Sequence, residues 1–514
     1  MQSNQNQTEE ILNEKMKQFN ILINHGKLAF NQHQYDGVKF CINRELTPLL
    51  GIRGGFIADE MGLGKTITTI ATIFANYVGN TLIILPPALL SQWAHEIKRT
   101  TGHTAIVYHG STKKKITKQM LEKAPIVLAT YNGIQYSETA NILHQTQWAR
   151  IVFDEAHHLR NKTLILSGAL QLKSHIKWFI SGTPIQNKIR DFINLCHVAG
   201  ISQTNYTREE LTTIILTKLV LRRTKQEVGI EMPSVTMNHE IVKWQSTNEK
   251  ELAEEIHSSL HFSHVSADKS HSLSQVFSVK GILIPMIRAK QMCTLPILLK
   301  PKIQSLEQQR IIEPGYTQNI NRSTNSKLDK VIETLLSRKD NNNGKIIFCQ
   351  YRSEIDEIAR RLKEGGMKNV ESIDGRNNKE SRKKILTPSK QENLTKTLIL
   401  QIQTGCEGLN LQENYSEVYF VTPHWNPSVE DQAIARCHRM GQKKEVQVFR
   451  FEMEGFDELD NIERQLEERQ QELESEEYNP IIPTLSIDSH IINIQNTKRD
   501  IICKLLNYQS VKDS

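Results

Sequence analysis

The sequence predicts an α/β protein with two parallel sheets and a helical insertion between them. Two blocks of the 514-residue chain, at about 66–184 and 345–451, alternate short apolar runs with longer helical runs. This alternation is typical of doubly wound parallel sheets, in which ligand-binding loops follow the carboxyl ends of the strands. Between the blocks, from about 191 to 300, the alternation stops and helical segments dominate. We therefore expect the chemistry at the ends of strands.

Each block contains enough apolar runs for a sheet of its own. In the first block the candidate strands are 81–85, 104–108, 126–130, 150–153 and 177–180, with helices such as 89–99, 116–123 and 163–173. The insertion contains helical runs at 211–223, 248–260 and 273–293. In the second block the candidate strands are 345–349, 370–373, 397–401, 418–421 and 446–451, with helices at 353–363, 379–386 and 428–438.

These runs divide the chain into consecutive parts. We expect a polar N-terminal segment (1–27), a first lobe (28–235), helical protrusions (190–300), a linker (301–326), a second lobe (327–456), and an acidic helix and tail (457–514). The linker is expected because its Pro, Gly, Asn and Gln residues show no periodicity. A single nucleotide-binding domain would not need the second sheet, so we expect the function at the junction of the lobes.

Composition and charge exclude several protein classes. No apolar run reaches the length of a membrane span, and the N-terminus lacks the apolar core of a signal peptide. The seven cysteines are scattered singly without a Cys-x-x-Cys pair, which favours free thiols in a reducing intracellular compartment and argues against zinc. The net charge of +7 permits a basic nucleic-acid surface without requiring one, and 457–477 is strongly acidic.

A candidate phosphate-binding loop lies at 59–66, where an apolar run turns into a helical one. The loop contains Gly62 and Gly64 and ends in Gly-Lys-Thr. In such loops backbone N–H groups surround the phosphates; here Lys65 would reach the β and γ phosphates and Thr66 would ligate Mg²⁺. Ala58 occupies the place of the usual first glycine, and a glycine turn before a helix is common without any ligand.

A carboxylate pair follows the apolar run 151–153. Phosphoryl transfer to water requires one acid to hold Mg²⁺ and a second to orient and deprotonate the attacking water. We assign the first role to Asp154 and the second to Glu155. His157, two residues later, is expected to act as a relay, with a packed histidine as the alternative.

Two further motifs complete the candidate chemistry. Ser181 and Thr183 lie in a Ser-Gly-Thr-Pro turn after the run 178–180, where their hydroxyls could sense the γ-phosphate, although the turn alone is ordinary. Arg436 and Arg439 are three residues apart on a predicted helix and hence on one face. Two guanidinium groups suit a triphosphate whose charge grows in the transition state. The alternative is a solvated basic face.

Six motifs in this order resemble the Snf2 family of helicase-like ATPases within superfamily 2. The motifs are 59–66, 154–157, 181–187, 408–411, 425–427 and the set Gln432, Arg436, His438, Arg439, Gly441 and Gln442. The resemblance extends from about 33 to 450, which is most of the chain. It implies two RecA-like lobes that close on ATP and Mg²⁺, with double-stranded DNA as the partner.

The resemblance also implies roles for individual residues. The ATP-binding residues would be Gln34, at the adenine edge, with Asp59, Gly62, Leu63, Gly64, Lys65 and Thr66. The residues that couple hydrolysis to movement would be His157, Ser181, Thr183 and Gln432. The phosphate contacts of DNA would be Thr130 and Tyr131 on one lobe, and Thr404, Gly405 and Asn410 on the other. Trp425 has two equal interpretations, a core tryptophan or an aromatic against a DNA groove.

The chain departs from the usual family pattern at two places. Gly405-Cys406-Glu407 replaces a glycine pair, and Pro423-His424 replaces an aspartate before Trp-Asn-Pro. These variations resemble the Rad5/Rad16-like branch and viral members. Together with the Asn-, Gln-, Lys- and Ile-rich composition, they indicate a nucleus, a viral replication compartment or a microbial cytoplasm as the location.

Two rival interpretations remain beside translocation on double-stranded DNA. A strand-separating superfamily 2 helicase also carries Asp-Glu-Ala-His, but the Trp-Asn-Pro and Arg-x-x-Arg-x-Gly-Gln context favours movement without strand separation. A non-catalytic DNA-binding scaffold is disfavoured because the lysine, both acids and both arginines are present. The DNA-bound protein complex that would be remodelled is not identified by the sequence.

Overall fold

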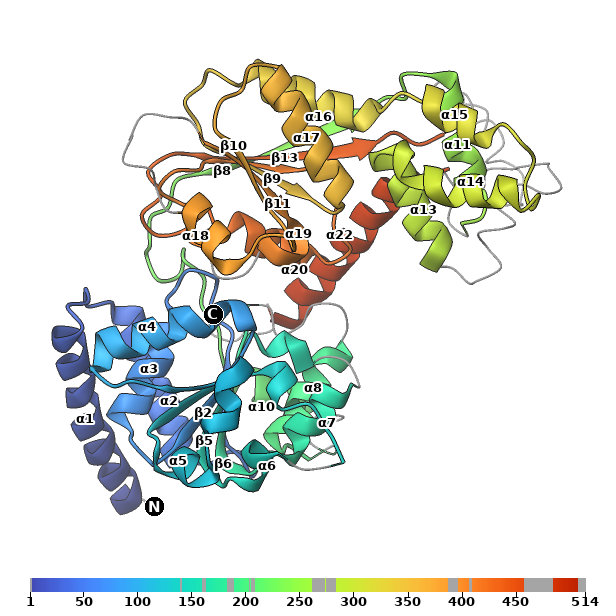
Figure 1. The fold of residues 1–514 in the computed structure, drawn as a ribbon. Helices are drawn as coiled ribbons and strands as arrows, with labels where there is room; N and C mark the ends of the chain where they lie inside the picture. The colour runs from blue at the N-terminus through green and yellow to red at the C-terminus, as the bar shows by residue number, and fades with distance from the viewer. Residues whose placement is uncertain are drawn as a thin grey trace, which may run out of the picture. The chain divides into compact units, whose positions relative to one another are not determined.

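The computed structural model describes residues 2–138, 141–159, 163–182, 189–202, 204, 209–260, 273, 283–386, 396–405, 409–456 and 484–506. The chain forms two units, Met1–Met232 with Lys498–Ser514, and Pro233–Thr497. Each unit contains one sheet whose strand pairs are all parallel (Figure 1). The predicted α/β class with two parallel sheets is confirmed.

The first unit contains a seven-stranded sheet in the order β3-β4-β2-β5-β6-β1-β7. Its strands are β1 Arg53–Ile57, β2 Thr81–Leu85, β3 Ile106–Tyr108, β4 Ile126–Thr130, β5 Trp148–Asp154, β6 Ser174–Ile180 and β7 Val220–Leu221. Its helices are α1 Gln2–His25, α2 Gln32–Leu46, α3 Lys65–Ala75, α4 Leu90–Thr101, α5 Lys118–Lys123, α6 Ile142–Gln145, α7 Leu164–Gln171, α8 Ile189–Ala199 and α10 Glu209–Lys218, with 3-10 turns at Pro87–Leu89, Gly110–Lys115, Tyr131–Gly133 and Ala156–Leu159.

Both faces of this sheet are covered, as parallel sheets require. Along β2, Leu82 and Ile84 join the core on one face, whereas Ile83 and Leu85 join the core on the other, because successive strand residues point to opposite sides. Helix α1 lies against α2 and α3 (Figure 1). The segment that looks polar in the sequence thus adds a stripe of buried side chains to the core, namely Leu12, Met16, Phe19, Leu22 and Ile23.

The second unit contains a six-stranded sheet in the order β10-β11-β9-β12-β13-β8. Its strands are β8 Val235–Val242, β9 Lys345–Cys349, β10 Val370–Ile373, β11 Thr397–Gln401, β12 Glu417–Phe420 and β13 Val446–Met453. Its helices are α11 Thr247–His257, α13 Leu283–Thr294, α14 Lys300–Gln308, α15 Tyr316–Arg322, α16 Ser326–Ser337, α17 Arg352–Glu364, α18 Lys379–Leu386, α19 Ile402–Gly405, α20 Pro427–Ile434 and α22 Ile487–Leu506, with a 3-10 turn at Pro296–Leu299.

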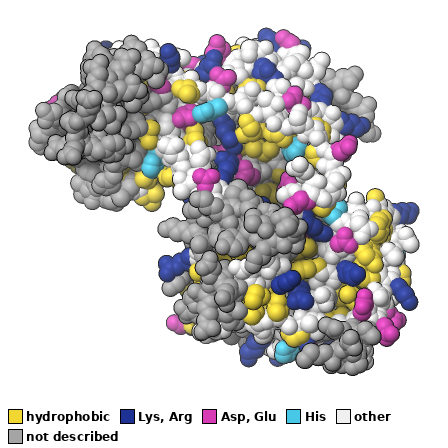
Figure 2. All heavy atoms as spheres, turned by 180° about the vertical axis from the view of Figure 1, so that it is seen from behind, with side chains coloured by type: hydrophobic (Ala, Val, Ile, Leu, Met, Phe, Trp, Pro, Cys, Tyr) yellow, Lys and Arg dark blue, Asp and Glu magenta, His cyan; other side chains and the backbone are white. Residues whose placement is uncertain are grey.

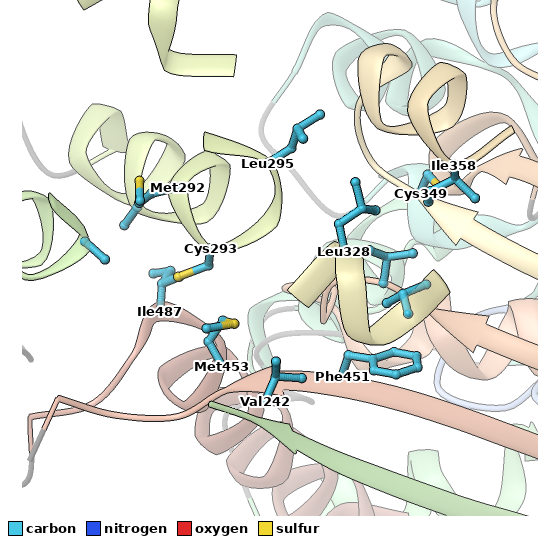
Figure 3. Packing of buried hydrophobic residues seen from close by; sticks show 14 of the residues in the cluster. Val242, Met292, Cys293, Leu295, Leu328, Cys349, Ile358, Phe451, Met453 and Ile487 are labelled. Carbon is cyan, nitrogen blue, oxygen red and sulfur yellow. The ribbon is translucent and has the colours of Figure 1, made fainter. Parts of the chain in front are cut away.

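The largest core of this unit joins the sheet to the helices of the insertion. Figure 3 shows Cys293 of α13 beside Ile487 at the start of α22, with Met453 nearby. Helices α16 and α17 cover this face of the sheet, while α18, α19 and α20 lie on the other face (Figure 1). The insertion and the second sheet therefore share one hydrophobic core.

Three segments differ from the elements expected from the sequence. Strand β8 lies within the region expected to be helical, and it pairs with β13 from Val235 opposite Val446 to Val242 opposite Met453. The expected helix 211–223 ends at Lys218, because Val220 and Leu221 pair with β1. The expected linker contains α14 and α15: Pro301 falls in the first turn of α14, where proline is tolerated, and that helix buries Ile303 and Leu306.

The face drawn in Figure 2 does not single out one region by its charge. On the face drawn in Figure 2, Lys and Arg side chains lie among acidic and neutral ones over both units, without one continuous basic band. No described helix combines the length and the apolar character that crossing a membrane requires. The acidic stretch 457–477 lies outside the described residues. The site must therefore be found from individual contacts.

Candidate active site

The phosphate-binding loop connects β1 to α3. Gly62 and Gly64 have φ angles of 98° and 79°, and Gly64 is the N-cap of α3. A Cβ atom on Gly64 would lie 2.2 Å from Nε2 of Gln34, so both the backbone conformation and the space require glycine there. The loop ends at the positive N-terminus of α3, which attracts phosphate.

Helix α2 packs its first turn against this loop. The imidazole Nε2 of His33 and the amide Nε2 of Gln34 lie 3.0 and 3.5 Å from the carbonyl oxygen of Leu63. Both side chains are buried. The structure thus places Gln34 directly beside Gly64, while its contact with adenine stays a prediction.

The acids that open the loop are bound to the segment after β7. Both carboxylate oxygens of Asp59 accept hydrogen bonds from Arg223, at 3.0 Å from Nε and 2.5 Å from Nη2, and Asp59 is 1% exposed. Glu60 forms an ion pair with Lys225 at 3.0 Å. The structure therefore shows Asp59 as an anchor of the loop, while its contact with ATP stays a prediction.

Lys65 lies across its own loop. Its Nζ donates to the carbonyl oxygens of Asp59 at 2.8 Å and Glu60 at 3.3 Å. Burial raises the pKa of Asp154, and the positive charge of Lys65 opposes this rise. Thr66, the second residue of α3, is half-buried.

Asp154 ends β5 with both carboxylate oxygens oriented. Trp93 Nε1 donates to Oδ2 at 2.7 Å, and the backbone N–H of Glu155 donates to Oδ1 at 3.0 Å. Burial and the neighbouring Glu155 charge raise the pKa of Asp154 to about 7, although the Trp93 hydrogen bond and Lys65 oppose this shift. A buried, oriented carboxylate that resists ionisation fits a divalent cation, because the cation would neutralise its charge.

Glu155 adopts a backbone conformation that is rare for its residue type. Its φ angle of 50° lies in the left-handed region, which costs a residue with a side chain about 1–2 kcal/mol. Its Oε2 lies 3.3 Å from Nδ1 of His157. Strain of this kind concentrates at functional sites, and here it sets the direction of the second acid.

An aromatic stack connects the acid pair to the end of β4. The Tyr131 hydroxyl donates to the carbonyl oxygen of Asp154 at 2.7 Å, and the Tyr131 ring stacks on His158, which stacks on His157. Tyr131 and Thr130 are 3% and 1% exposed. His157 therefore both packs against His158 and lies close to Glu155. The contacts of Thr130 and Tyr131 with DNA phosphates stay predictions.

Ser181 follows β6 and lies beside the phosphate-binding loop. Its backbone N–H donates to the carbonyl oxygen of Ile57 at 3.1 Å. A Cβ atom on Gly182 would lie 2.9 Å from Met61 and 3.5 Å from Nζ of Lys65, so this segment contacts the loop closely. Thr183 lies outside the described residues.

In the second unit, the predicted helix 428–438 is wrong at its C-terminus. Helix α20 ends at Ile434, and Arg436 and Arg439 lie in successive turns instead of on one helix face. The carbonyl oxygen of Arg436 accepts from the N–H of Leu411 at 3.1 Å. The side chain of Arg439 donates to Asn410 Oδ1. The chain leaves the helix because these turns are tied to 410–411.

Gln442 holds the end of this arginine-bearing turn. Its Nε2 donates to the carbonyl oxygens of Tyr415 at 2.9 Å and Cys437 at 3.2 Å, and its Oε1 accepts from the N–H groups of Lys443 and Lys444. Gln432 is buried within α20. The Arg-x-x-Arg-x-Gly-Gln sequence is thus a fixed turn closed by one amide side chain.

The remaining predicted DNA contacts lie in three places. Thr404 and Gly405 are the last two residues of α19, which directly follows β11. The Thr404 side chain lies outside the part of the chain that the structure describes. Asn410 is exposed and accepts from Arg439. Trp425 is half-buried, with one side against the core of the unit, so both of its interpretations stay open.

Two family descriptions match the sequence over these segments. The SNF2-related domain matches residues 33–209, which include the phosphate-binding loop and the acid pair. The helicase conserved C-terminal domain matches residues 326–441, which include the arginine-bearing turn. The chain belongs to the Snf2 family. It is accordingly a helicase-like ATPase by descent.

Individual relatives are consistent with this assignment, and a solved structure shares the fold. The chain is 27% identical over 462 residues to a probable global transactivator of Orgyia pseudotsugata multicapsid polyhedrosis virus, covering 85% of this chain and 89% of that protein. It is 28% identical over 464 residues to the ATP-dependent DNA helicase DDM1 of Arabidopsis thaliana, covering 81% of this chain and 58% of that protein. The Pyrococcus furiosus Hef helicase domain shares the fold, with a TM-score of 0.51 and 16% identity over 86% of this chain and 98% of that domain.

Sequence reasoning on this Snf2 chain missed three features of the site. The Trp93 hydrogen bond to Asp154 and the left-handed conformation of Glu155 have no signal in a single sequence. The Lys-Lys-Lys run that ends the 3-10 turn at Gly110–Lys115 was visible in the sequence. Its Lys114 and Lys115 are exposed, and β3, the strand before it, is paired with β4, which ends at Thr130.

Proposed function

We propose that this Snf2 ATPase hydrolyses ATP with Mg²⁺ and uses the energy to move along double-stranded DNA without separating its strands. The observation that carries the proposal is that one sheet holds both the phosphate-binding loop, with Lys65 after β1, and the oriented, buried carboxylate of Asp154 at the end of β5. Lys65 and the N-terminus of α3 bind the phosphates. Thr66 and Asp154 hold Mg²⁺, which when bound neutralises charge on the β and γ oxygens.

Glu155 acts on the attacking water in this proposal. Its strained backbone sets the direction of the carboxylate, whose Oε2 lies 3.3 Å from Nδ1 of His157. Arg436 and Arg439 supply positive charge to the transition state, where such groups contribute about 10³–10⁵ in rate in other phosphoryl-transfer enzymes. Replacing Arg439 with Ala is therefore expected to lower kcat with little change in the KM for ATP.

The nucleic-acid partner follows from the chemistry of the exposed groups and from relatives. Lys114, Lys115 and Lys118 are exposed in the turn and helix that follow the edge strand β3, so they can contact phosphates without reading bases. DDM1 is named a DNA helicase, which supports DNA as the polymer. Binding is expected to be independent of sequence and to weaken as salt rises.

The experiment compares displacement of a bound protein with displacement of a strand. One substrate is a blunt duplex that carries streptavidin on an internal biotin, and the other is a tailed duplex with a labelled strand. ATP-dependent release of streptavidin without strand release is expected, and Glu155→Gln should abolish it. Efficient strand release from the tailed duplex would instead identify a strand-separating helicase. ATP binding without hydrolysis in the unaltered chain would identify a non-catalytic scaffold.

A further inference from the structure

The segment 422–426 joins β12 to α20, and helix α13 holds it from one side. Nζ of Lys290 donates to the carbonyl oxygen of Pro423 at 2.7 Å and lies 6.0 Å from the centroid of the Trp425 ring. One turn later, the Thr294 hydroxyl lies 2.9 Å from that of Thr422. Lys290 is 2% exposed, so a buried cation is aimed at this segment.

Helix α22 holds the same segment from another direction. Nε2 of Gln495, which is 1% exposed, donates to the carbonyl oxygen of His424 at 2.5 Å and to Glu430 at 2.7 Å. The rings of His490 and Trp425 meet edge to face, with centroids 6.4 Å apart. Figure 3 shows that α13 and α22 are neighbours, since Cys293 points toward Ile487 at the start of α22.

The buried carboxylate of Glu430 connects these contacts to α20 and to the sheet. It accepts from the N–H of His424 at 2.8 Å and forms an ion pair with Arg450 of β13 at 2.9 Å. Trp425 directly precedes the N-cap Asn426, whose side chain accepts from the N–H of Ser428. The entry of the chain into α20 is therefore fixed by polar groups from α13, α22 and β13.

Helix α20 connects this fixed point to the arginine-bearing turn. It runs from Pro427 to Ile434, and Arg436 follows two residues later. At about 1.5 Å per residue, the helix is about 12 Å long, which is too short to bend appreciably. A movement of Trp425 would therefore displace the C-terminal end of α20 at Ile434, and the turn that carries Arg436 begins directly after it.

We propose that Lys290 and Gln495 are positioning residues: they fix Trp425 and the start of α20 so that DNA contact at Trp425 reaches the two arginines. The proposal rests on the proposed function, because it assigns the path between duplex binding and hydrolysis. Burying a cation and an amide costs desolvation that apolar side chains would avoid, and such groups restrict their neighbours to one geometry. Burial lowers the pKa of Lys290 to about 8, so the cation persists near neutral pH.

The test uses the full chain with substitutions at both residues. Lys290→Met removes the charge at similar size, Lys290→Arg restores a cation, and Gln495→Leu removes the amide. Asn496→Leu is the matched control, because Asn496 is the exposed neighbour of Gln495 on the same helix. The first measurement is the ratio of duplex-stimulated to basal ATPase rate. The second is the emission of Trp425, obtained by subtracting the spectrum of Trp425→Phe variants, with and without duplex.

The expected result is a tenfold fall in the stimulation ratio for Lys290→Met and Gln495→Leu, about 1.4 kcal/mol. In these two variants the basal ATPase rate and the KM for ATP should be unchanged, and the Trp425 emission should shift. Lys290→Arg should recover at least half of the stimulation ratio, and Asn496→Leu should match the parent. Unchanged Trp425 emission and an unchanged ratio in both variants would overturn the proposal. If the parent chain itself shows no duplex stimulation, the proposed function fails, whereas the Trp425 emission still decides whether Lys290 and Gln495 position that ring.

Discussion

Asp59→Asn distinguishes an anchoring residue from a residue that contacts ATP. Asp59 is 1% exposed and accepts two hydrogen bonds from Arg223, whose side chain is 17% exposed. Removing one partner of a fully buried pair costs about 3–5 kcal/mol. Because Arg223 retains some contact with water, we expect a loss of about 2–3 kcal/mol in the free energy of unfolding. The KM for ATP should rise with it, since the loop loses its attachment.

A double-mutant cycle provides the assay. Asp59→Asn, Arg223→Met and the double variant are compared by urea unfolding and by the KM for ATP. If Asp59 acts through Arg223, the two effects should be strongly non-additive, with a coupling of at least about 1.5 kcal/mol in stability. Additive effects on both stability and KM would refute the anchoring role and favour a direct contact with ATP.

The neighbouring ion pair is a matched control for this cycle. Glu60 forms its ion pair with Lys225 at 3.0 Å, but its side chain is 41% exposed. Lys225 is buried, but the Glu60 carboxylate itself stays in contact with water, so Glu60→Gln should change stability less than Asp59→Asn does. A loss as large at Glu60 as at Asp59 would show that burial does not explain the effect.

Three other changes have distinct expected outcomes. Glu155→Gln should reduce kcat at least about 10³-fold while ATP binding, measured with a fluorescent analogue, is retained; DNA-stimulated hydrolysis that survives would contradict the role of Glu155. Gly64→Ala places a Cβ atom 2.2 Å from Gln34 and should raise the KM for ATP. Gly366→Ala is the control, because Gly366 has a similar φ of 83° but no atom within 4 Å of the added Cβ; it should lose only about 1 kcal/mol of stability without a change in KM. Equal effects of the two substitutions on KM would contradict the clash. Burial lowers the pKa of His257 to about 4. As the pH falls below about 6.5, the His257 side chain is therefore protonated in the unfolded chain while it stays neutral in the folded chain. Asp154, with its raised pKa, has the opposite effect over the same range, so the comparison is between parent and variant: the stability of the parent relative to His257→Gln in urea unfolding should fall by about 2 kcal/mol from about pH 7.5 to pH 5, and a difference that does not change with pH would contradict this role.

The sequence predicted the places of the loop and of the acid pair in the fold better than it predicted their contacts. The loop around Lys65 and the pair Asp154–Glu155 could be placed because apolar runs and helices alternate regularly around them. The bond between Asp59 and Arg223 could not be placed, because it joins residues 164 positions apart and depends on β7 pairing with β1. Long-range pairing of this kind leaves no periodic signal in one sequence.

The predicted helices, strands and linker were wrong where tertiary contacts override the local preference of the sequence. Strand β8 is partly polar and lies at the edge of its sheet. Its sequence therefore lacks the apolar run that identifies a buried strand. Pro301 suggested a linker, yet proline is tolerated in the first helical turn, and Ile303 and Leu306 complete the buried face of α14. Helix α20 stops at Ile434 because backbone contacts with Leu411 and the amide of Gln442 hold the following turn, which helix propensity cannot show.

The most direct test of the central claim is the ATPase rate measured with double-stranded DNA, single-stranded DNA and RNA at equal nucleotide concentration. If the chain is a translocase on duplex DNA, blunt double-stranded DNA should stimulate hydrolysis at least about tenfold more than either single-stranded polymer, and the stimulation should fall as salt is raised. Equal or stronger stimulation by single-stranded DNA or RNA would contradict the claim.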